Sequence, residues 1–281
     1  MTPEPNVSRY YDRHVLKPPV WTWEIPAYFF VGGMAGASAV LATAARLTGN
    51  HRLARSATLG GVACLALCPP LLIDDLGRPD RFLNMLRVFR PTSPMSVGTW
   101  ILSAFGALAS TAAASELSGR ARRVGVLAEA GAAILGPGLA TYTAALVAQT
   151  SVPAWHQARR YLPFLFAASS AAAAGGLACI TTPGAAGRPA RRLAIGGALA
   201  EVGVARLMEG GLGAVGEPYR IESAAPFASA SRRLMLSGAA VLAIFGWRRA
   251  GACVGGLLVM GGSAATRFAV WKAGDLSARR T

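Results

Sequence analysis

The run PAYFFVGGMAGASAVLATAAR, residues 26–46, contains 20 consecutive uncharged residues before it reaches Arg46. A helix of about 20 such residues crosses the hydrocarbon core of a bilayer, where every backbone amide must find its hydrogen-bond partner within the helix. The other segments with this pattern are 56–76, 97–115, 124–148, 162–180, 192–212, 232–248 and 251–271. The sequence therefore predicts an all-α integral membrane protein, a bundle of about eight transmembrane helices.

Composition supports a lipid-embedded chain. Of the 281 residues, 53% are hydrophobic and only 15% are charged, which is too apolar for an ordinary soluble domain. A mixed-charge segment from Arg9 to Lys17 precedes the first run, and no convincing cleavage site follows it, so we expect a mature span and not a signal peptide. The expected organisation is a polar N-terminal head (1–20), one eight-span membrane domain (21–273) and a short basic tail (274–281).

The 28 Lys and Arg residues give a formal charge of +15, but they stand in short clusters between the apolar runs. This spacing is typical of membrane topology and argues against nucleic acid as a partner. We call side B the side reached after the odd-numbered spans, and side A the other. The side B loops are short, nearly free of acids and dense in arginine, which predicts a cytoplasmic side B in a multi-pass protein of the cell membrane. The total count of Lys and Arg is higher on side A and favours the opposite orientation.

Cysteine and histidine residues are not placed as cofactor ligands. The four cysteines all lie within apolar spans, and the three histidines lie in a tail or in loops, where no two can face each other across the bilayer: Cys64, Cys68, Cys179, Cys253, His14, His51 and His156. Buried small residues explain these cysteines better than a metal or cluster site does. We therefore expect no metal, no haem and no iron-sulfur cluster held by this chain.

Polar and aromatic residues gather on side A, beginning at the first span. Glu24 and Tyr28 stand four residues apart, so they share one face of the helix just below the interface. A carboxylate and a phenol there can bond the head group of a quinone and exchange protons with it. Trp21 and Trp23 are better explained as part of an interfacial aromatic belt.

Two acids end the second span. Asp74 and Asp75 follow an apolar run and precede Arg78. Carboxylates at this depth are costly unless they are paired or hydrated, so they predict a shaped polar pocket. An ion pair at a helix end, with Asp74 and Arg78 four residues apart, is the structural alternative.

The fourth span combines a helix-bending proline with hydroxyl groups. Pro137 opens the hydrogen-bond ladder, and Thr141 or Tyr142 can occupy the geometry that it frees. In the following loop, His156 is a candidate proton donor, although a lone loop histidine is more often simply solvated.

Charges also interrupt the spans themselves. In the sixth span, Arg206 and Glu209 are three residues apart and are expected to neutralise one another, whereas Glu201 has no evident partner in the sequence. A proton path and a buried structural pair are both open for these residues and for Glu129. Small residues recur in most spans, as at Gly36 and in later spans, and predict close helix packing.

Several stretches together resemble the NrfD/PsrC family, the membrane subunits of polysulfide reductase-type and related molybdoenzyme complexes. They are Trp23 to Gly36, Asp75-Leu-Gly-Arg-Pro-Asp-Arg81, Ser93-Pro-Met-Ser-Val-Gly-Thr-Trp100, Gly136-Pro-Gly-Leu-Ala-Thr-Tyr-Thr-Ala144 and Val152-Pro-Ala-Trp155. The resemblance covers nearly the whole chain. It implies a bundle without its own redox group that exchanges electrons between membrane quinone or quinol, menaquinone in particular, and an iron-sulfur (ferredoxin-like) subunit serving a molybdopterin oxidoreductase subunit.

The resemblance also implies where the quinone is held, near the face that meets the partner. The candidate quinone ligands are Glu24, Tyr28, Asp74, Asp75, Arg78, Thr141, Tyr142 and His156, and those expected to act in proton exchange are Glu24, Tyr28, Asp75 and Arg78. Two rival hypotheses remain at this point. A passive anchor would keep the docking loops without quinone chemistry, and a secondary transporter would use the charges within the spans as its substrate path.

Overall fold

The computed structural model describes residues 19–75, 84–221 and 223–280, and the regular elements in these ranges are all helical. Arg78, one of the candidate quinone ligands, lies outside the described residues. The elements are α1 (Glu24–Leu47), α2 (His51–Ala66), α3 (Cys68–Asp75), α4 (Pro94–Ser118), α5 (Arg122–Ala148), α6 (Pro153–Gln157), η3 (Ala158–Arg160), α7 (Leu162–Thr181), η4 (Gly184–Gly187), α8 (Arg188–Gly211), η5 (Gly213–Tyr219), α9 (Ala225–Phe245) and α10 (Arg249–Arg279).

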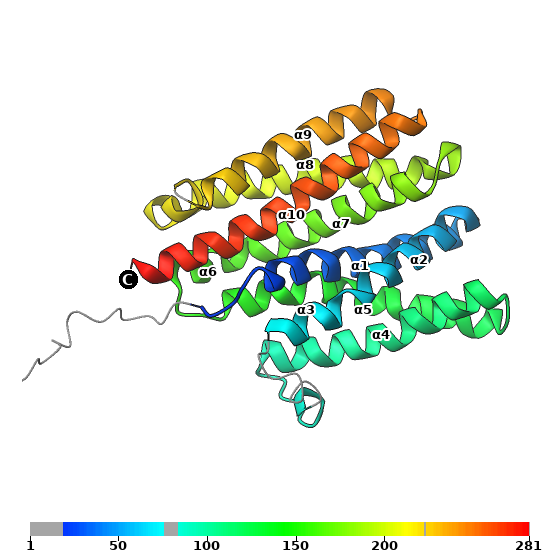
Figure 1. Ribbon diagram of the computed structural model, residues 1–281, viewed down its shortest axis with the longest axis horizontal. Helices are drawn as coiled ribbons and strands as arrows, with labels where there is room; N and C mark the ends of the chain where they lie inside the picture. Colours follow the sequence, from blue (N-terminus) through cyan, green and yellow to red (C-terminus); the bar gives the residue numbers. More distant parts are fainter. Residues whose placement is uncertain (1–18, 76–83, 222, 281) are drawn as a thin grey trace, which may run out of the picture.

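The long helices form one elongated bundle, in which each runs antiparallel to the next along the chain (Figure 1). The turns after α1, α4, α7 and α9 lie at one end of the bundle, which is side B. The start of α1, the short helices α3 and α6 and the end of α10 lie at the opposite end, side A. Helix α1 packs against α2, α5 and α7, and α10 packs against α7 and α9, so α1, α7 and α10 form the interior of the bundle.

The prediction of an all-α membrane bundle is confirmed. Seven helices in the described chain are long and apolar enough to cross a membrane, with α2 and α3 counted as one stretch, His51–Asp75. The predicted sixth span forms a helix of 24 residues, α8, but it does not reach the same apolarity. The charged residues that interrupt its pattern explain the difference, and α8 packs between α7 and α9.

Several helix boundaries differ from the sequence prediction by more than three residues, among them the start of α9, which is Ala225 where residue 232 was expected. Two further differences have a clear local cause. The second span is interrupted at Leu67, because Pro69 and Pro70 follow and cannot donate backbone hydrogen bonds. The last helix was predicted to end at residue 271 but continues to Arg279, where a tail was expected. An ion pair with Asp275, 3.1 Å away and one turn earlier, supports this final stretch.

The outer surface of the bundle is apolar and its interior is tightly packed by small residues. Leu127 and Ile134 of α5 are 73% and 79% exposed, as expected of side chains that face lipid tails. Inside, a Cβ added to Gly36 of α1 would collide with the backbone carbonyl of Gly136 in α5. The predicted role of the glycines in close helix packing is thus confirmed at this crossing.

Candidate functional site

At side A the bundle contains a cavity of about 120 Å³ between α1, α4 and α5, closed by the end of α3 and by residues that precede α4. Its wall is mostly apolar, with a few polar groups from each of the first four spans. The lining residues are Trp21, Ile25, Tyr28, Phe29, Leu72, Asp75, Met85, Leu86, Met95, Thr99, Leu102, Ser103, Tyr142 and Leu146. An apolar cavity with a few convergent polar groups is typical of a site for a small organic ligand.

Two tyrosines meet on this wall. The hydroxyl groups of Tyr28 in α1 and Tyr142 in α5 are hydrogen-bonded to each other across the helix interface. Tyr28 is only 2% exposed, and its ring lies tilted by 58° to that of Phe29, with the ring centroids 6.2 Å apart. Tyr142 lies directly over Gly98 of α4, where any side chain would occupy the space of its ring. The glycine therefore determines where the Tyr142 hydroxyl can lie.

Asp75 is joined to the start of α1 through Thr22. The backbone N–H and the hydroxyl of Thr22 lie 3.4 Å and 3.3 Å from the Asp75 carboxylate, and the same hydroxyl donates to Glu24. Since a hydroxyl carries one proton, it serves one of the two carboxylates at a time. Glu24 is nearly buried and stands behind the cavity wall, whereas Asp75 lies on the wall itself. The three groups form a continuous polar path from the cavity to the base of α1.

Trp21 and Trp155 cover the same end of the bundle. Their rings stack at a centroid distance of 5.6 Å, and Trp155 of α6 donates its indole N–H to the Val270 carbonyl, 2.7 Å away. Trp23 is 55% exposed, which agrees with its predicted place in an interfacial belt. Trp21 instead lines the cavity and packs inward. Its stacking on Trp155 depends on α6, which is distant in the sequence, so the residues around Trp21 gave no sign of it.

Besides Glu24, three of the predicted quinone ligands do not line this cavity. Asp74 is exposed at the end of α3, because successive helix positions point in different directions and Asp75 takes the inward one. The Thr141 hydroxyl donates to the Pro137 carbonyl at 2.7 Å and does not line the cavity wall. His156 is exposed on α6, while its neighbour Trp155 is buried.

The charges within the spans form pairs that the sequence did not identify. Glu209 binds Arg232 of α9 at 2.8 Å and 2.9 Å, so the predicted pair with Arg206 is wrong. Residues three apart were the nearest candidates along the chain, but the neighbouring helix offers a better placed cation. Glu201 accepts hydrogen bonds from Ser231 and Thr266.

A fully buried arginine was missed altogether. Arg267 of α10 donates to the Phe166 carbonyl and to the Ser170 hydroxyl, both at 2.9 Å, and its guanidinium lies 3.7 Å from the centre of the Phe166 ring. An arginine inside an apolar run is itself the signal that identifies such a residue.

Glu129 belongs to a buried ion pair at the other end of the bundle. Arg46 of α1 donates to both of its carboxylate oxygens at 2.7 Å and also to Glu116 of α4, while Thr58 of α2 donates to Glu129 at 2.8 Å. Of the two alternatives for Glu129, the structure thus contains the buried pair. In the described part of the chain, no group of three or more His, Cys, Asp or Glu residues is placed to hold a metal ion.

The helices and their apolar exterior define a multi-pass α-helical membrane protein. Residues 14–196 match the family described as polysulphide reductase, NrfD, which is more than half of the chain. The chain belongs to this family, and the resemblance seen in its motifs is confirmed. Membership implies a membrane subunit of a polysulphide reductase-type complex. All residues that line the side A cavity lie within the matched range. No curated protein matches the chain.

Proposed function

We propose that this protein is the quinone-reactive membrane subunit of a respiratory oxidoreductase complex, and that the side A cavity is where it binds quinone or quinol. The observation that carries the proposal is the composition of the cavity wall. Aliphatic, methionine and aromatic side chains suit a quinone ring and its first isoprenoid unit, and Tyr28, Tyr142 and Asp75 supply polar groups for the two oxygens of the head group.

The tyrosine pair is suited to a ligand whose hydrogen-bonding character changes with its redox state. A quinone oxygen only accepts hydrogen bonds, whereas a quinol hydroxyl also donates one. A hydroxyl can donate or accept, so Tyr28 and Tyr142 adapt to both forms by turning their O–H bonds. The pair therefore binds either form without moving its rings.

Quinol oxidation releases two protons together with two electrons, and quinone reduction takes up the same number. Asp75 is the group on the wall that is able to accept or supply a proton. From there, the hydroxyl of Thr22, which is exposed at side A, can bond either to Asp75 or to the nearly buried Glu24. We propose that these three residues exchange protons between the bound ligand and the water on side A.

The site lies at the end of the bundle where α3, α6 and the end of α10 are found. A partner protein that docks on the side A face lies nearer to the bound ligand than one that docks on side B. Electrons are therefore expected to pass between the ligand and the partner through the side A face. We infer that an iron-sulfur subunit of the ferredoxin type docks there and connects the site to a molybdopterin subunit, in agreement with the complexes to which the family belongs. A passive anchor would dock the same partners but would bind no quinone, so ligand binding distinguishes the two hypotheses.

The test is the binding of a fluorescent menaquinol analogue to the purified protein in detergent. We expect saturable binding by the wild type, and a dissociation constant raised roughly five- to tenfold in Tyr28→Phe and in Tyr142→Phe, because each loses one hydrogen bond of about 1 kcal/mol. Asp75→Asn is expected to bind the ligand but to lower the rate of quinol oxidation in the complex.

Tyr219→Phe is the matched control. Tyr219 is a buried tyrosine in η5 that does not line the side A cavity, and its hydroxyl has no hydrogen-bond partner among the described residues. This variant should bind like the wild type. A folded wild-type protein that does not bind the analogue, or tyrosine variants that bind it as well as the control does, would refute the proposal and favour a passive anchor.

A further inference from the structure

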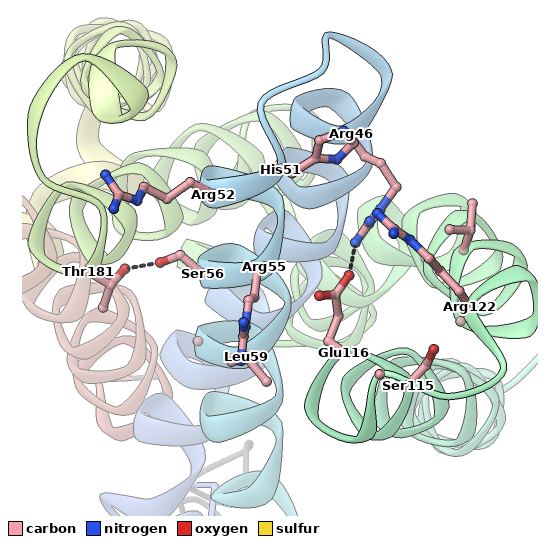
Figure 2. Close-up of a pocket in the computed structure, with 14 residues that line it drawn as sticks. Arg46, His51, Arg52, Arg55, Ser56, Leu59, Ser115, Glu116, Arg122 and Thr181 are labelled. Carbon is pink, nitrogen blue, oxygen red and sulfur yellow. Dashed lines mark hydrogen bonds and ion pairs between the residues drawn. The ribbon is translucent and has the colours of Figure 1, made fainter.

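A second cavity lies at side B, at the opposite end of the bundle from the candidate quinone site. It has a volume of about 800 Å³ and lies between α2 on one side and α4 and α5 on the other (Figure 2). Four arginines line it, from three different helices: Arg46, Arg52, Arg55 and Arg122. Cavities of this size hold small organic ligands or lipid head groups.

Most of this positive charge is uncompensated. Arg46 is neutralised by Glu116 and Glu129, with which it forms the ion pairs described above. In the part of the chain that the structure describes, Arg52, Arg55 and Arg122 form no ion pair, and all three are exposed. Three guanidinium groups thus surround a cavity whose one carboxylate, Glu116, is already engaged.

Two helix ends add to the positive potential. Helix α2 begins at His51 and α5 begins at Arg122, both on the rim of the cavity. Neither helix has an acidic residue in its first turn, and no side chain caps the start of α5. The positive ends of both helix dipoles and the unpaired amides of α5 therefore favour an anion at the same place as the arginines.

The cavity is amphipathic along the direction of the helices. Leu59 follows Arg55 by one helical turn, and Val126 follows Arg122 by one turn, so an apolar residue lies below each of these two cations toward the middle of the membrane. The residue one turn after Arg52 is the polar Ser56. Val126 is 39% exposed and faces outward. The part of the cavity near the side B surface thus suits an anionic group, and the part toward the middle of the membrane suits hydrocarbon.

We propose that this side B cavity binds a phosphate-bearing anion, held by Arg52, Arg55 and Arg122. Guanidinium groups bind phosphate oxygens through paired N–H donors, which matches the chemistry of the rim. Such a group comes either from the head group of an anionic lipid or from a soluble phosphate compound. The apolar residues below the arginines favour the lipid, whose chains would follow α2 and α5 into the bilayer.

Arginines in these loops are also expected from membrane topology alone, so the experiment includes a control for the general positive charge of side B. The control is a second triple variant, R123Q/R188Q/R192Q, which removes the same charge from exposed arginines that do not line this cavity. The test variant is R52Q/R55Q/R122Q. Both are compared with the wild type after size-exclusion chromatography and far-UV circular dichroism show folded protein.

Binding is measured by native mass spectrometry of the full chain in non-ionic detergent, titrated with phosphatidylglycerol, phosphatidylcholine or pyrophosphate. A basic residue near an anionic lipid contributes about fivefold in affinity, so the pocket triple variant should bind phosphatidylglycerol on the order of 100-fold more weakly than the wild type. The control triple should stay within about twofold of the wild type. The single variants R55Q and R123Q repeat the comparison if a triple variant does not fold, with about fivefold expected for R55Q alone.

The two ligand arms identify the source of the phosphate. Stronger binding of phosphatidylglycerol than of phosphatidylcholine, lost only in the pocket variants, assigns the site to a lipid head group. Saturable pyrophosphate binding that is lost in the same variants, without a preference between the lipids, assigns it to a soluble phosphate. Equal weakening by both triple variants, or weakening by neither, would overturn the proposal, because the cavity would then contribute nothing beyond the general charge of side B.

Discussion

Replacing Glu129 with alanine is expected to lower the free energy of unfolding by about 3 kcal/mol. The Glu129 side chain is 3% exposed, and its carboxylate accepts three hydrogen bonds, two from Arg46 at 2.7 Å and one from Thr58 at 2.8 Å. Its removal leaves the Arg46 guanidinium, which is mostly buried at 13% exposure, and the buried Thr58 hydroxyl with fewer partners. These groups belong to α1, α2 and α5, so the loss loosens three helices at once.

The magnitude follows from what remains after the substitution. Removing one partner of a buried ion pair costs about 3–5 kcal/mol, because the other charge stays uncompensated. Arg46 retains Glu116 in the variant, so the low end of this range applies. Glu116→Ala should cost about 1 kcal/mol or less, because the Glu116 side chain is 23% exposed and Arg46 keeps its two bonds to Glu129.

The assay is reversible unfolding in mixed detergent micelles by added sodium dodecyl sulfate, followed by circular dichroism. Which of the two alanine variants loses more free energy of unfolding is the sharper result, because it depends only on which carboxylate is the main partner of Arg46. A loss below about 0.5 kcal/mol for Glu129→Ala, or a larger loss for Glu116→Ala, would refute the reasoning. The double variant Arg46→Met with Glu129→Leu should recover most of the stability lost in Glu129→Ala, because the cation and its buried carboxylate are removed together. Only Glu116 then loses its cation, and its side chain is 23% exposed to solvent.

Further substitutions test other contacts. Gly98→Ala should displace the Tyr142 ring and weaken binding of the menaquinol analogue at least tenfold, without loss of helix content in circular dichroism. Gly136→Leu should prevent the close approach of α5 to Gly36 and lower stability by about 2 kcal/mol or more in the same unfolding assay. Trp155→Phe loses a buried indole hydrogen bond and ring volume, and should cost about 1–2 kcal/mol by that assay while α6 remains helical by hydrogen exchange.

The fold was largely predictable because each span carries its own signal. An apolar run of about 20 residues must form a helix in lipid, whatever its neighbours are. The prediction was less accurate where charges or prolines enter. At Leu67 two prolines divide the second span, and α8 is a long helix with too many charged residues to qualify as an apolar span. At the C-terminus, helix propensity and the pair between Asp275 and Arg279 extend α10 beyond its apolar part.

The candidate site was predictable only in part. Helical spacing placed Glu24 and Tyr28 near one another, and both lie at side A, but Tyr28 lines the cavity whereas Glu24 stands behind it. Adjacent positions such as Asp74 and Asp75 looked equivalent in sequence, and only the direction of α3 separates them. Partners from distant helices had no local signal at all, as the contact of Trp21 with a residue of α6 illustrates.

Helices α1 and α5 illustrate why contacts between distant residues depend on packing along the whole length of two helices. Three of the contacts between these helices are spread along α1: the tyrosine bond of Tyr28 and Tyr142 at side A, the backbone crossing of Gly36 and Gly136, and the ion pair of Arg46 with Glu129 at side B. The helices are antiparallel, so one register satisfies all three, and a slip of one turn would break each of them. The two hydroxyls in the candidate quinone site therefore meet because a backbone contact and a buried charge farther along the same helices hold that register.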